Sequence, residues 1–267
     1  MKIFSIITVN FNDVNGLKKT IESVTSQKFE SFEYIIIDGG STDGSLEVIK
    51  EHDALIDHWV SEHDNGIYPA MNKGVHFAHG KYLNFMNSGD VFHDEDVLNK
   101  VYAEITNEDI VIGNCYIANT NHPYSHLRQS QCVTMMTLMK EIINHQSTFY
   151  NRTIFEKHLY DEQLKIIADW KLNLESIIFD NCKVKIINVF VADYDLSGIS
   201  TTNSILFQQE RKKVLDELIP KRIQQDYERL YTDEELPIVT LLPQLKESWR
   251  LQRFVYRFTK WLLKFRK

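Results

Sequence analysis

Two hydrophobic patterns alternate along the first hundred residues of the chain. Ile3–Val9 and Glu33–Ile37 are nearly continuous runs of apolar, often β-branched residues, which predicts two strands. Leu17–Ser26 and Ser45–His52 instead carry apolar residues at helical spacing. The order strand, helix, strand, helix predicts a parallel sheet. Because the apolar runs leave no polar face for water, we expect helices to cover this sheet on both sides.

The alternation continues to about residue 205 and then changes. We expect helices from near Tyr68 to Gly80, at Glu95–Thr106 and at Ile166–Phe179. We expect strands at Lys81–Met86, Ile110–Asn114 and Val184–Ala192, and a polar loop at Asn119–Gln131. Beyond Ser204 the chain is charged, helical in pattern and interrupted by prolines. We therefore predict an α/β domain at 1–205 and a helical C-terminal extension at 206–267.

Charge is distributed unevenly along the chain. The 267 residues carry 30 basic and 37 acidic side chains, a net charge of −7, which gives no general signal for a polyanion and argues against nucleic acid as a partner. The segment 249–267 contains seven basic residues and no acidic one, so the rest of the chain stands at −14. The two parts should therefore meet different surroundings.

The segment 249–267 also has the pattern of an amphipathic helix. Its apolar residues recur at helical spacing, with the basic residues largely between them: Leu251, Phe254, Val255, Phe258, Trp261, Leu262 and Phe265. Such a helix lies in a membrane interface, with its Lys and Arg side chains toward anionic lipid. The alternative is that the apolar stripe packs on the catalytic domain or on another subunit. The one-sided charge favours peripheral membrane contact.

The N-terminus and the cysteines bear on the compartment. Ile3–Val9 begins almost at once, without the features of a signal peptide, and no apolar run is long enough to span a bilayer. Cys115, Cys132 and Cys182 are widely spaced and form no CxxC pair, so we expect buried, reduced thiols. These features predict a cytoplasmic protein that is soluble or peripheral on the inner face of the membrane.

The second predicted strand ends in a glycine-rich turn, DGGSTDG, from Asp38 to Gly44. A carboxylate there can accept hydrogen bonds from a nucleobase imide or a ribose, and glycines let a ligand approach the backbone. The alternative is an ordinary turn in which Ser41 or Thr42 caps the following helix. The GxGxxG fingerprint of dinucleotide-binding proteins is absent, which disfavours a dehydrogenase.

Another acidic strand end is NSGD at 87–90, directly after the apolar strand that ends at Met86. Sites in open parallel sheets lie beyond the carboxyl ends of the strands, so Asp90 should share an edge with Asp38. Mg²⁺ and Mn²⁺ prefer oxygen ligands, and Mg²⁺ often takes only one or two carboxylates beside phosphate and water. Asp90 is therefore a candidate metal ligand, and a turn or cap residue is the alternative.

Three ordered blocks carry a family resemblance. They are YIIIDGGSTDG at 34–44, SEHDNGIYPAMNKG at 61–74 and FMNSGD at 85–90. They resemble glycosyltransferase family 2 of the GT-A fold, and particularly the bacterial polysaccharide-assembly, colanic-acid-type subset with the pattern IIIDGGSTDG, SExDxGIYDAMNKG and FxNSGD. The resemblance continues through His145-Gln146, Ala168-Asp169-Trp170 and Leu196–Ser200. It implies a Rossmann-like, mainly parallel sheet flanked by helices, over roughly residues 1–205.

The resemblance implies a site for a nucleotide-diphospho-sugar donor. By position in the motifs, the nucleoside would be held by Thr8, Asn10 and Asp38, with the Asp38 carboxylate on the base, usually uracil. The donor pocket would be lined by Asp64, Asn72 and Lys73. Pro69 departs from the pattern, because relatives usually carry Asp there; proline is tolerated in a first helical turn, so the change affects the choice of sugar rather than the helix.

The resemblance also implies the remaining parts of an inverting transferase. Asp90 would bind Mn²⁺ or Mg²⁺, although Ser88-Gly89 replaces the first acid of a DxD motif. Asp169 would be the general base for the acceptor hydroxyl, and His145 would lie on the acceptor side. The chemistry independently asks for such a carboxylate, since a positioned base contributes about 10²- to 10⁴-fold in rate. The alternative for Asp169 is a helix-start acid favoured by the helix dipole.

Together these features predict an inverting glycosyltransferase. The donor would be a UDP-sugar, and the acceptor a glycan or lipid-linked glycan in cell-surface polysaccharide synthesis. The alternatives are a nucleotide-binding dehydrogenase and an inactive sugar-nucleotide-binding or membrane-scaffold relative. The missing GxGxxG argues against the first alternative, and the presence of Asp169 and Asp90 argues against the second.

Overall fold

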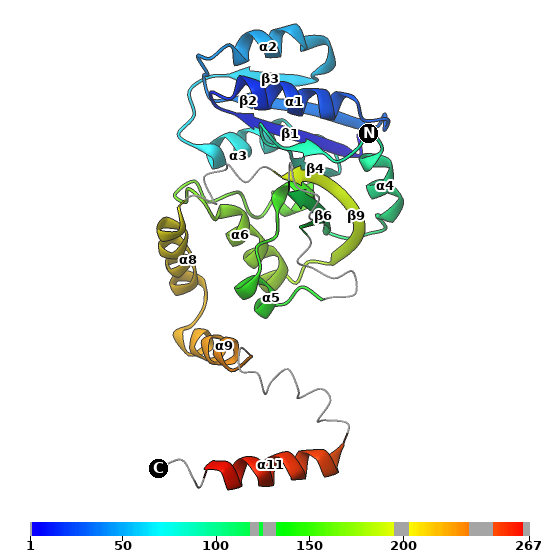
Figure 1. Cartoon of the computed structure of the whole chain (residues 1–267). Coiled ribbons are helices and arrows are strands. Elements are labelled where there is room, and N and C mark those ends of the chain that lie inside the picture. Colours follow the sequence, from blue (N-terminus) through cyan, green and yellow to red (C-terminus); the bar gives the residue numbers. More distant parts are fainter. Residues whose placement is uncertain (1, 118–122, 125–131, 195–202, 235–247, 264–267) are drawn as a thin grey trace. The chain divides into compact units, whose positions relative to one another are not determined.

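The structure is a computed structural model that describes residues 2–117, 123–124, 132–194, 203–234 and 248–263 (Figure 1). The chain forms two compact units, Met1–Val214 and Leu215–Lys267. The helix α8 (Ser204–Leu218) contributes residues to both units. The boundary that we predict at 205 lies near the start of this helix.

A curled sheet organises the first unit, and its described strands follow the order β3-β2-β1-β4-β8-β6-β9-β5, with β7 paired to β6. The four N-terminal neighbours are parallel: β1 (Phe4–Asn10) pairs with β2 (Phe32–Asp38) and β4 (Tyr82–Phe85), and β2 pairs with β3 (His58–Ser61). The remaining strands are β5 (Val91–Phe92), β6 (Ile110–Ile117), β7 (Pro123–Tyr124), β8 (Thr148–Asn151) and β9 (Val184–Tyr194).

The later strands make the sheet mixed. The strand β8 runs antiparallel to both β4 and β6, and β5 runs antiparallel to β9, whereas β6 and β9 are parallel. The fold is therefore an α/β fold with a mainly parallel sheet, as predicted. The antiparallel members are strands of two to four residues, too short to show a hydrophobic period.

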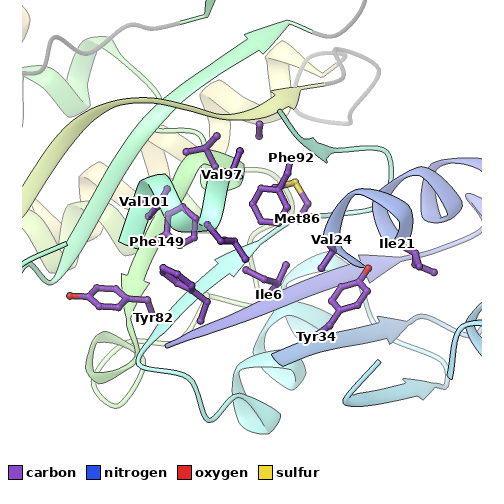
Figure 2. Close-up of a cluster of buried hydrophobic side chains, with 14 of the residues drawn as sticks. Ile6, Ile21, Val24, Tyr34, Tyr82, Met86, Phe92, Val97, Val101 and Phe149 are labelled. Atoms are coloured by element: carbon purple, nitrogen blue, oxygen red, sulfur yellow. The ribbon is translucent and has the colours of Figure 1, made fainter. Parts of the chain in front are cut away.

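Helices cover the sheet on both faces. The first unit contains α1 (Val14–Thr25), α2 (Ser45–Glu51), α3 (Ile67–Phe77), α4 (Val97–Glu104), α5 (Met135–Lys140) and α6 (Ala168–Asn173), besides the start of α8. Residues of α1, α2 and α4 join one hydrophobic cluster with Phe4 and Ile6 of β1 (Figure 2). On the other face, α3 packs against the alternate strand residues, Ile7 and Ile37. The strands are thus buried on both faces, which confirms the prediction.

The packing of α3 on the sheet explains a glycine in the motif MNKG. A Cβ atom at Gly74 would lie 2.5 Å from Cγ2 of Ile7 and 3.5 Å from Cγ1 of Ile37. The helix can approach β1 and β2 this closely only because position 74 has no side chain. Gly74 therefore sets the distance between α3 and the sheet.

The region predicted as one helix, 166–179, contains two helical forms. The α-helix α6 ends at Asn173, and residues Leu174–Phe179 form a π-helix in which the amide of Asp180 donates to the carbonyl of Glu175. The hydroxyl of Ser176 also donates to the carbonyl of Leu172 at 2.8 Å. Such a competing side-chain bond favours local widening of a helix.

The cysteine prediction is wrong in part. Cys115 is buried in the core, but Cys132 is exposed and Cys182 is only partly buried. Most of the predicted loop 119–131 and the motif residues Leu196–Ser200 lie outside the described residues.

The second unit begins with the end of α8 and continues with α9 (Lys221–Glu234) and α11 (Trp249–Leu263). At 100° per residue, the basic residues of α11 fall on one stripe and Leu251, Phe254, Phe258 and Trp261 fall on an adjacent one, whereas Trp249 lies on the other side of the basic stripe. The apolar side chains Leu251, Phe254, Phe258 and Trp261 are exposed. Among the described residues, no helix is both long enough and apolar enough to cross a bilayer.

Candidate active site

Four segments meet at the carboxyl edge of the parallel strands. The amide of Gly39 donates to the carbonyl of Asn10 at 2.9 Å, which joins the ends of β2 and β1. The amide of Glu62 donates to the carbonyl of Asp38 at 3.0 Å, and the amide of Ser88 donates to that of Val9 at 3.1 Å. The loops after β1, β2, β3 and β4 are therefore tied into one surface, as the strand-end argument predicts.

The carboxylate of Asp38 lies at the centre of this surface and is fully buried. One oxygen accepts from Asn10 Nδ2 at 2.7 Å and from Ser41 Oγ at 2.5 Å. The other accepts from the Ser41 amide at 3.0 Å and from Ser61 Oγ at 2.6 Å. Burial alone would raise the pKa of Asp38, but these hydrogen bonds, led by those from Ser41 and Ser61, outweigh it and lower the pKa.

The glycine-rich turn is ordered by side-chain bonds rather than by a conventional cap. Ser41 and Thr42 do not cap α2, because its N-cap is Gly44, which makes no side-chain hydrogen bond. Ser41 bonds Asp38 instead, and the Thr42 amide donates to Asn12 Oδ1 at 2.8 Å. Gly40 has φ +79°, and a Cβ there would lie 3.2 Å from the backbone nitrogen of His63. The turn thus packs directly on the segment after β3.

Thr8 and Asn10 have different environments. Thr8 is fully buried, and its hydroxyl donates to the carbonyl of Met86 at 2.7 Å and lies 3.0 Å from the hydroxyl of Tyr34. It therefore links β1 to β4 inside the core. Asn10 is also buried, but its Oδ1 atom has no hydrogen-bond partner among the described residues. A buried acceptor of this kind can take a hydrogen bond from a ligand or from an ordered water.

Phe11 is a site residue that the sequence analysis did not identify. Its side chain is 64% exposed, although it is a large apolar residue next to the buried Asn10. Its ring lies over Gly39, where an added Cβ would be 3.1 Å from Phe11 Cδ2. The only signal in the sequence was its position between two asparagines at a strand end. An exposed ring beside the Asp38 loop offers a flat apolar surface to a ligand.

Asp64 and Lys73 form an ion pair near this edge. Lys73 Nζ lies 2.5 Å from Asp64 Oδ1 and 2.7 Å from Glu62 Oε1. Burial would lower the pKa of Lys73, but the hydrogen bonds and charges of the two acids raise it. The second oxygen of Asp64 is buried and has no hydrogen-bond partner in the described part of the chain. This oxygen is a second buried acceptor among the predicted donor-site residues.

Asn72 is engaged with the protein backbone. Its Nδ2 atom donates to the carbonyl of Tyr160 at 2.9 Å, and its Oδ1 atom accepts from the amide of Tyr160 at 2.9 Å. It also donates to Glu162 at 2.9 Å. These bonds connect α3 to the segment before α6. The side chain of Asn72 is therefore used to position that segment in this structure.

The loop that carries Asp90 follows β4. The carbonyl of Asp90 accepts from Thr20 Oγ1 at 2.7 Å, and the Asp90 side chain is almost entirely buried. The hydroxyl of Ser88 lies 3.3 Å from Asp13 Oδ2. No group of three His, Cys, Asp or Glu side chains that could hold a metal ion occurs among the described residues. The oxygen donors here still fit a magnesium-type ion that takes most of its ligands from phosphate and water.

Asp169 and His145 lie together, connected to the loop after β4. Nδ1 of His145 is 3.4 Å from Asp169 Oδ2, and its Nε2 atom is 3.1 Å from Asn87 Nδ2. The other oxygen of Asp169 accepts from the Trp170 amide at 2.8 Å and from the Tyr68 hydroxyl at 3.4 Å. Burial and then the charge of Asp169 hold the pKa of Tyr68 well above its usual range, so this hydroxyl stays a donor.

This arrangement matches a known family. Residues 5–159 match the family described as Glycosyl transferase family 2. The chain belongs to this family. A "PGL/p-HBAD biosynthesis glycosyltransferase" of Mycobacterium bovis is 30% identical over 210 residues, which span 75% of this chain and 80% of that protein. The chain is therefore a glycosyltransferase.

Two solved structures show the same fold as this glycosyltransferase. One is S. aureus TarS 1–349 in complex with UDP-GlcNAc, with a TM-score of 0.58, 17% identity, and coverage of 76% of this chain and 61% of that one. The other is the mannosyltransferase PcManGT of Pyrobaculum calidifontis in complex with GDP-Man and Mn²⁺, with a TM-score of 0.58, 12% identity, and coverage of 94% and 82%. The GT-A-type fold is therefore confirmed.

Proposed function

We propose that this glycosyltransferase inverts the anomeric centre of a UDP-sugar and uses Asp169 as its general base. The observation that carries the proposal is the chain of contacts from Asp169 through His145 to Asn87, three residues before Asp90. It joins a mostly enclosed carboxylate to the loop suited to a diphosphate and its metal. A base and a leaving-group site are the two requirements of an inverting transfer.

The nucleoside would bind over the loops after β1 and β2. The buried acceptor of Asn10 and the Asp38 carboxylate suit the donors of a uracil or a ribose, and the ring of Phe11 suits a base plane. The UDP-GlcNAc complex of the TarS structure supports a uridine donor. Thr8 would act from within the core, by fixing β1, and Asp64 and Lys73 would face the diphospho-sugar side.

A divalent cation would be held by Asp90, with phosphate oxygens and water as its other ligands. The Mn²⁺ in the PcManGT complex supports this assignment. When bound, the cation neutralises charge that develops on the departing diphosphate. No further protein carboxylate is required for that role.

The proposed transfer needs no protein base other than Asp169. Asp169 takes the proton of an acceptor hydroxyl as the acceptor oxygen forms a bond to the anomeric carbon. The bond between that carbon and the diphosphate oxygen breaks, and its electron pair leaves with the nucleoside diphosphate. Attack opposite to the leaving group inverts the anomeric configuration.

Donor hydrolysis tests the catalytic assignment without a known acceptor. We expect the parent protein to release UDP from at least one member of a panel of UDP-sugars in the presence of Mn²⁺. Asp169→Asn should lower that rate by about 10²-fold or more while nucleotide binding is kept. A rate within about threefold of the parent would remove Asp169 as the base. Release from no donor by the parent would favour the inactive-relative alternative.

Calorimetry tests the donor and metal assignments separately. We expect UDP to bind more tightly with Mn²⁺ than without it, and Asp90→Ala to abolish this difference. Glu47→Ala, at an exposed acid in the first turn of α2, is the control. Metal-independent binding of UDP to the parent would contradict the role of Asp90.

The acceptor would be a glycan or lipid-linked glycan, reached from the cytoplasmic face of a membrane through α11. Its exposed apolar stripe and one-sided basic charge support this peripheral contact. We expect the full-length protein to float with vesicles that contain anionic lipid. The full-length double variant Phe254→Ser/Phe258→Ser should remain in the soluble fraction, and equal flotation of both would contradict membrane contact.

A further inference from the structure

We propose that His145 is a positioning residue that selects the oxygen of Asp169 which receives the proton. This inference rests on the proposed function and names the atom that acts within it. His145 forms part of the 3-10 helix His145–Ser147, and its side chain is 19% exposed. That of Asp169 is 13% exposed, so protein groups and not bulk water surround most of its carboxylate.

The carboxylate of Asp169 is held from three elements. Oδ1 accepts from the amide of Trp170 in α6 at 2.8 Å and from the hydroxyl of Tyr68 in α3 at 3.4 Å. Oδ2 faces Nδ1 of His145 at 3.4 Å. The two longer contacts lie at the upper limit of hydrogen bonding, as catalytic contacts often do before a substrate is bound.

The contact with Asn87 fixes the tautomer of His145. With the Asn87 amide oriented as in this structure, Nδ2 is a donor only, and the Nε2 atom of His145, 3.1 Å away, accepts from it. The proton of the neutral ring then lies on Nδ1 and is donated to Asp169 Oδ2. The partner of one ring nitrogen thus determines what the other nitrogen does.

A count of lone pairs identifies the reacting oxygen. An ionised carboxylate has about four acceptor positions, two on each oxygen. Trp170 and Tyr68 use both positions of Oδ1, whereas His145 uses one position of Oδ2. The remaining acceptor position is therefore on Oδ2, and the acceptor hydroxyl would bind there. His145 keeps its own proton during the transfer, and the hydroxyl proton goes to Oδ2.

The contact with Asn87 connects the orientation of Asp169 to the loop that carries Asp90. Asn87 lies in the loop of Asp90, where the diphosphate would leave, and the same imidazole reaches the base. Loss of the imidazole would leave the base held at Oδ1 but without the His145 contact that orients Oδ2, and the terminal torsion of Asp has a broad minimum. The nucleoside side of the donor site should keep its geometry, because the described residues show no hydrogen bond or ion pair between His145 and Asn10, Asp38 or Asp64.

Three substitutions at one position separate this role from a general packing role. His145→Asn places an amide nitrogen near the position of Nδ1, so it can still donate to Asp169. His145→Gln places its amide near the position of Nε2 and serves as the matched control. We expect His145→Ala and His145→Gln to lower the rate of UDP release by about 30-fold, with the donor KM within about twofold, and His145→Asn to recover most of that loss.

A double variant distinguishes failure of this inference from failure of the proposed function. If His145 acts through Asp169, His145→Ala should cause no further loss in an Asp169→Asn background. Full activity of Asp169→Asn would defeat the proposed function itself. Two outcomes would defeat only the inference about His145. In the first, Asp169→Asn is inactive but His145→Ala stays within threefold of the parent. In the second, the losses of the two single variants add in the double variant.

Nitrogen NMR of the imidazole provides a readout that does not depend on turnover. We expect the parent to show His145 with its proton on Nδ1, assigned by comparison with the spectrum of His145→Gln. Asn87→Ala should shift the population toward the other tautomer, whereas Asn99→Ala, on α4, should not. A parent ring protonated on Nε2 alone would overturn the assignment.

Discussion

Asp38 shows how one side chain can order a binding loop before a ligand arrives. Its carboxylate accepts four hydrogen bonds, from Asn10, Ser61 and twice from Ser41. These bonds hold the glycine-rich turn against the ends of β1 and β3. Asp38 therefore contributes to folding as well as to the proposed donor site.

The lowered pKa of Asp38 makes this contribution depend on pH. Hydrogen bonds to a charged acceptor are worth roughly 1.5–3 kcal/mol each, so Asp38→Asn should lower the free energy of unfolding by about 2 kcal/mol at pH 7. Since the folded pKa lies below the unfolded value of about 3.9, the carboxylate stabilises the fold above that pH and loses its advantage as pH falls through the folded pKa.

Urea unfolding at pH 7 and pH 3 measures this effect. The difference in unfolding free energy between the parent and Asp38→Asn should shrink at the lower pH. Asp53→Asn serves as a control, because its carboxylate bonds the indole of Trp59 away from the Asp38 loop. A difference that stays constant or grows on acidification would contradict the assigned cause.

Sequence alone could nominate the acids of the candidate site but not their partners. Asp38, Asp90 and Asp169 stand at strand ends or a helix start, and the motifs identify them. The bridge from Asn87 to His145 depends on which loops touch, and neither residue follows a period that would reveal it. Phe11 could not be predicted because its exposure follows from the local path of the chain beyond β1.

At the scale of elements, α8 belongs partly to the catalytic unit. The carboxylate of Glu210 is buried and accepts from the amides of Lys165 and Ile166 at 2.8 and 3.0 Å. These amides precede α6, which carries Asp169. The guanidinium carbon of Arg211 lies 5.2 Å from the centroid of the Trp170 ring, and Trp170 follows Asp169 in the chain. The start of α8 therefore supports the segment that presents Asp169.

We expect Glu210→Ala to weaken this support. The substitution removes the acceptor of the buried Ile166 amide and of the partly buried Lys165 amide, which should cost about 1–3 kcal/mol of unfolding free energy. Donor hydrolysis should fall as well, since the segment before Asp169 loses its anchor. The neighbouring exposed residue Gln209 provides the control, and Gln209→Ala should change the stability by less than about 0.5 kcal/mol. Equal stability of the two variants would show that Glu210 is not an anchor.

The contact of α3 with the sheet gives a second element-scale prediction. A methyl group at position 74 would lie 2.5 Å from Ile7, so Gly74→Ala should destabilise the fold by about 1–3 kcal/mol despite the better helix propensity of alanine. Chemical denaturation measures the change. His76→Ala, on the exposed side of the same helix, should be nearly neutral. A stabilised Gly74→Ala variant would mean that α3 can move away from β1 at little cost.

The sequence predicts elements best where a pattern is long. The continuous apolar runs of β1, β2 and β4 and the helical spacing of α1 are clear signals, and the positions of these elements are confirmed. The short strands β5 and β8 have too few residues for a period, and partners distant in sequence define them. The π-helix after α6 also could not be predicted. The apolar residues there keep nearly the spacing of an α-helix, and the hydrogen bond of the Ser176 hydroxyl that accompanies the wider turn has no signature in that spacing.

At the scale of the whole molecule, opposite charges are separated along the chain. The segment 249–267 is wholly basic, whereas the remainder is strongly acidic. An anionic surface would attract the former and repel the latter. Segment 249–267 would therefore be the part of the chain that approaches such a surface.

Vesicle binding should therefore depend on salt and on the basic stripe of α11. Each basic residue near an anionic surface contributes about 1 kcal/mol, so Arg253→Gln/Arg257→Gln should weaken binding by about 2 kcal/mol, or roughly thirtyfold. Gln252→Ala should leave binding unchanged. Cosedimentation at low and high ionic strength measures both effects. Binding that is insensitive to salt and to the double substitution would indicate a purely apolar contact.

If a nucleotide binds at Asp38 as proposed, the filled acceptor positions of its carboxylate would also affect discrimination among nucleotides. A base that approaches this carboxylate finds no vacant lone pair, so it must replace a serine hydroxyl or an amide that is already bound. Binding would then exchange one hydrogen-bond donor of Asp38 for another. A base with a donor at the right position would lose little binding free energy, whereas a base without one would leave a buried carboxylate oxygen unsatisfied. Selectivity among nucleotides would thus depend on Ser41 and Ser61, which never need to touch the base.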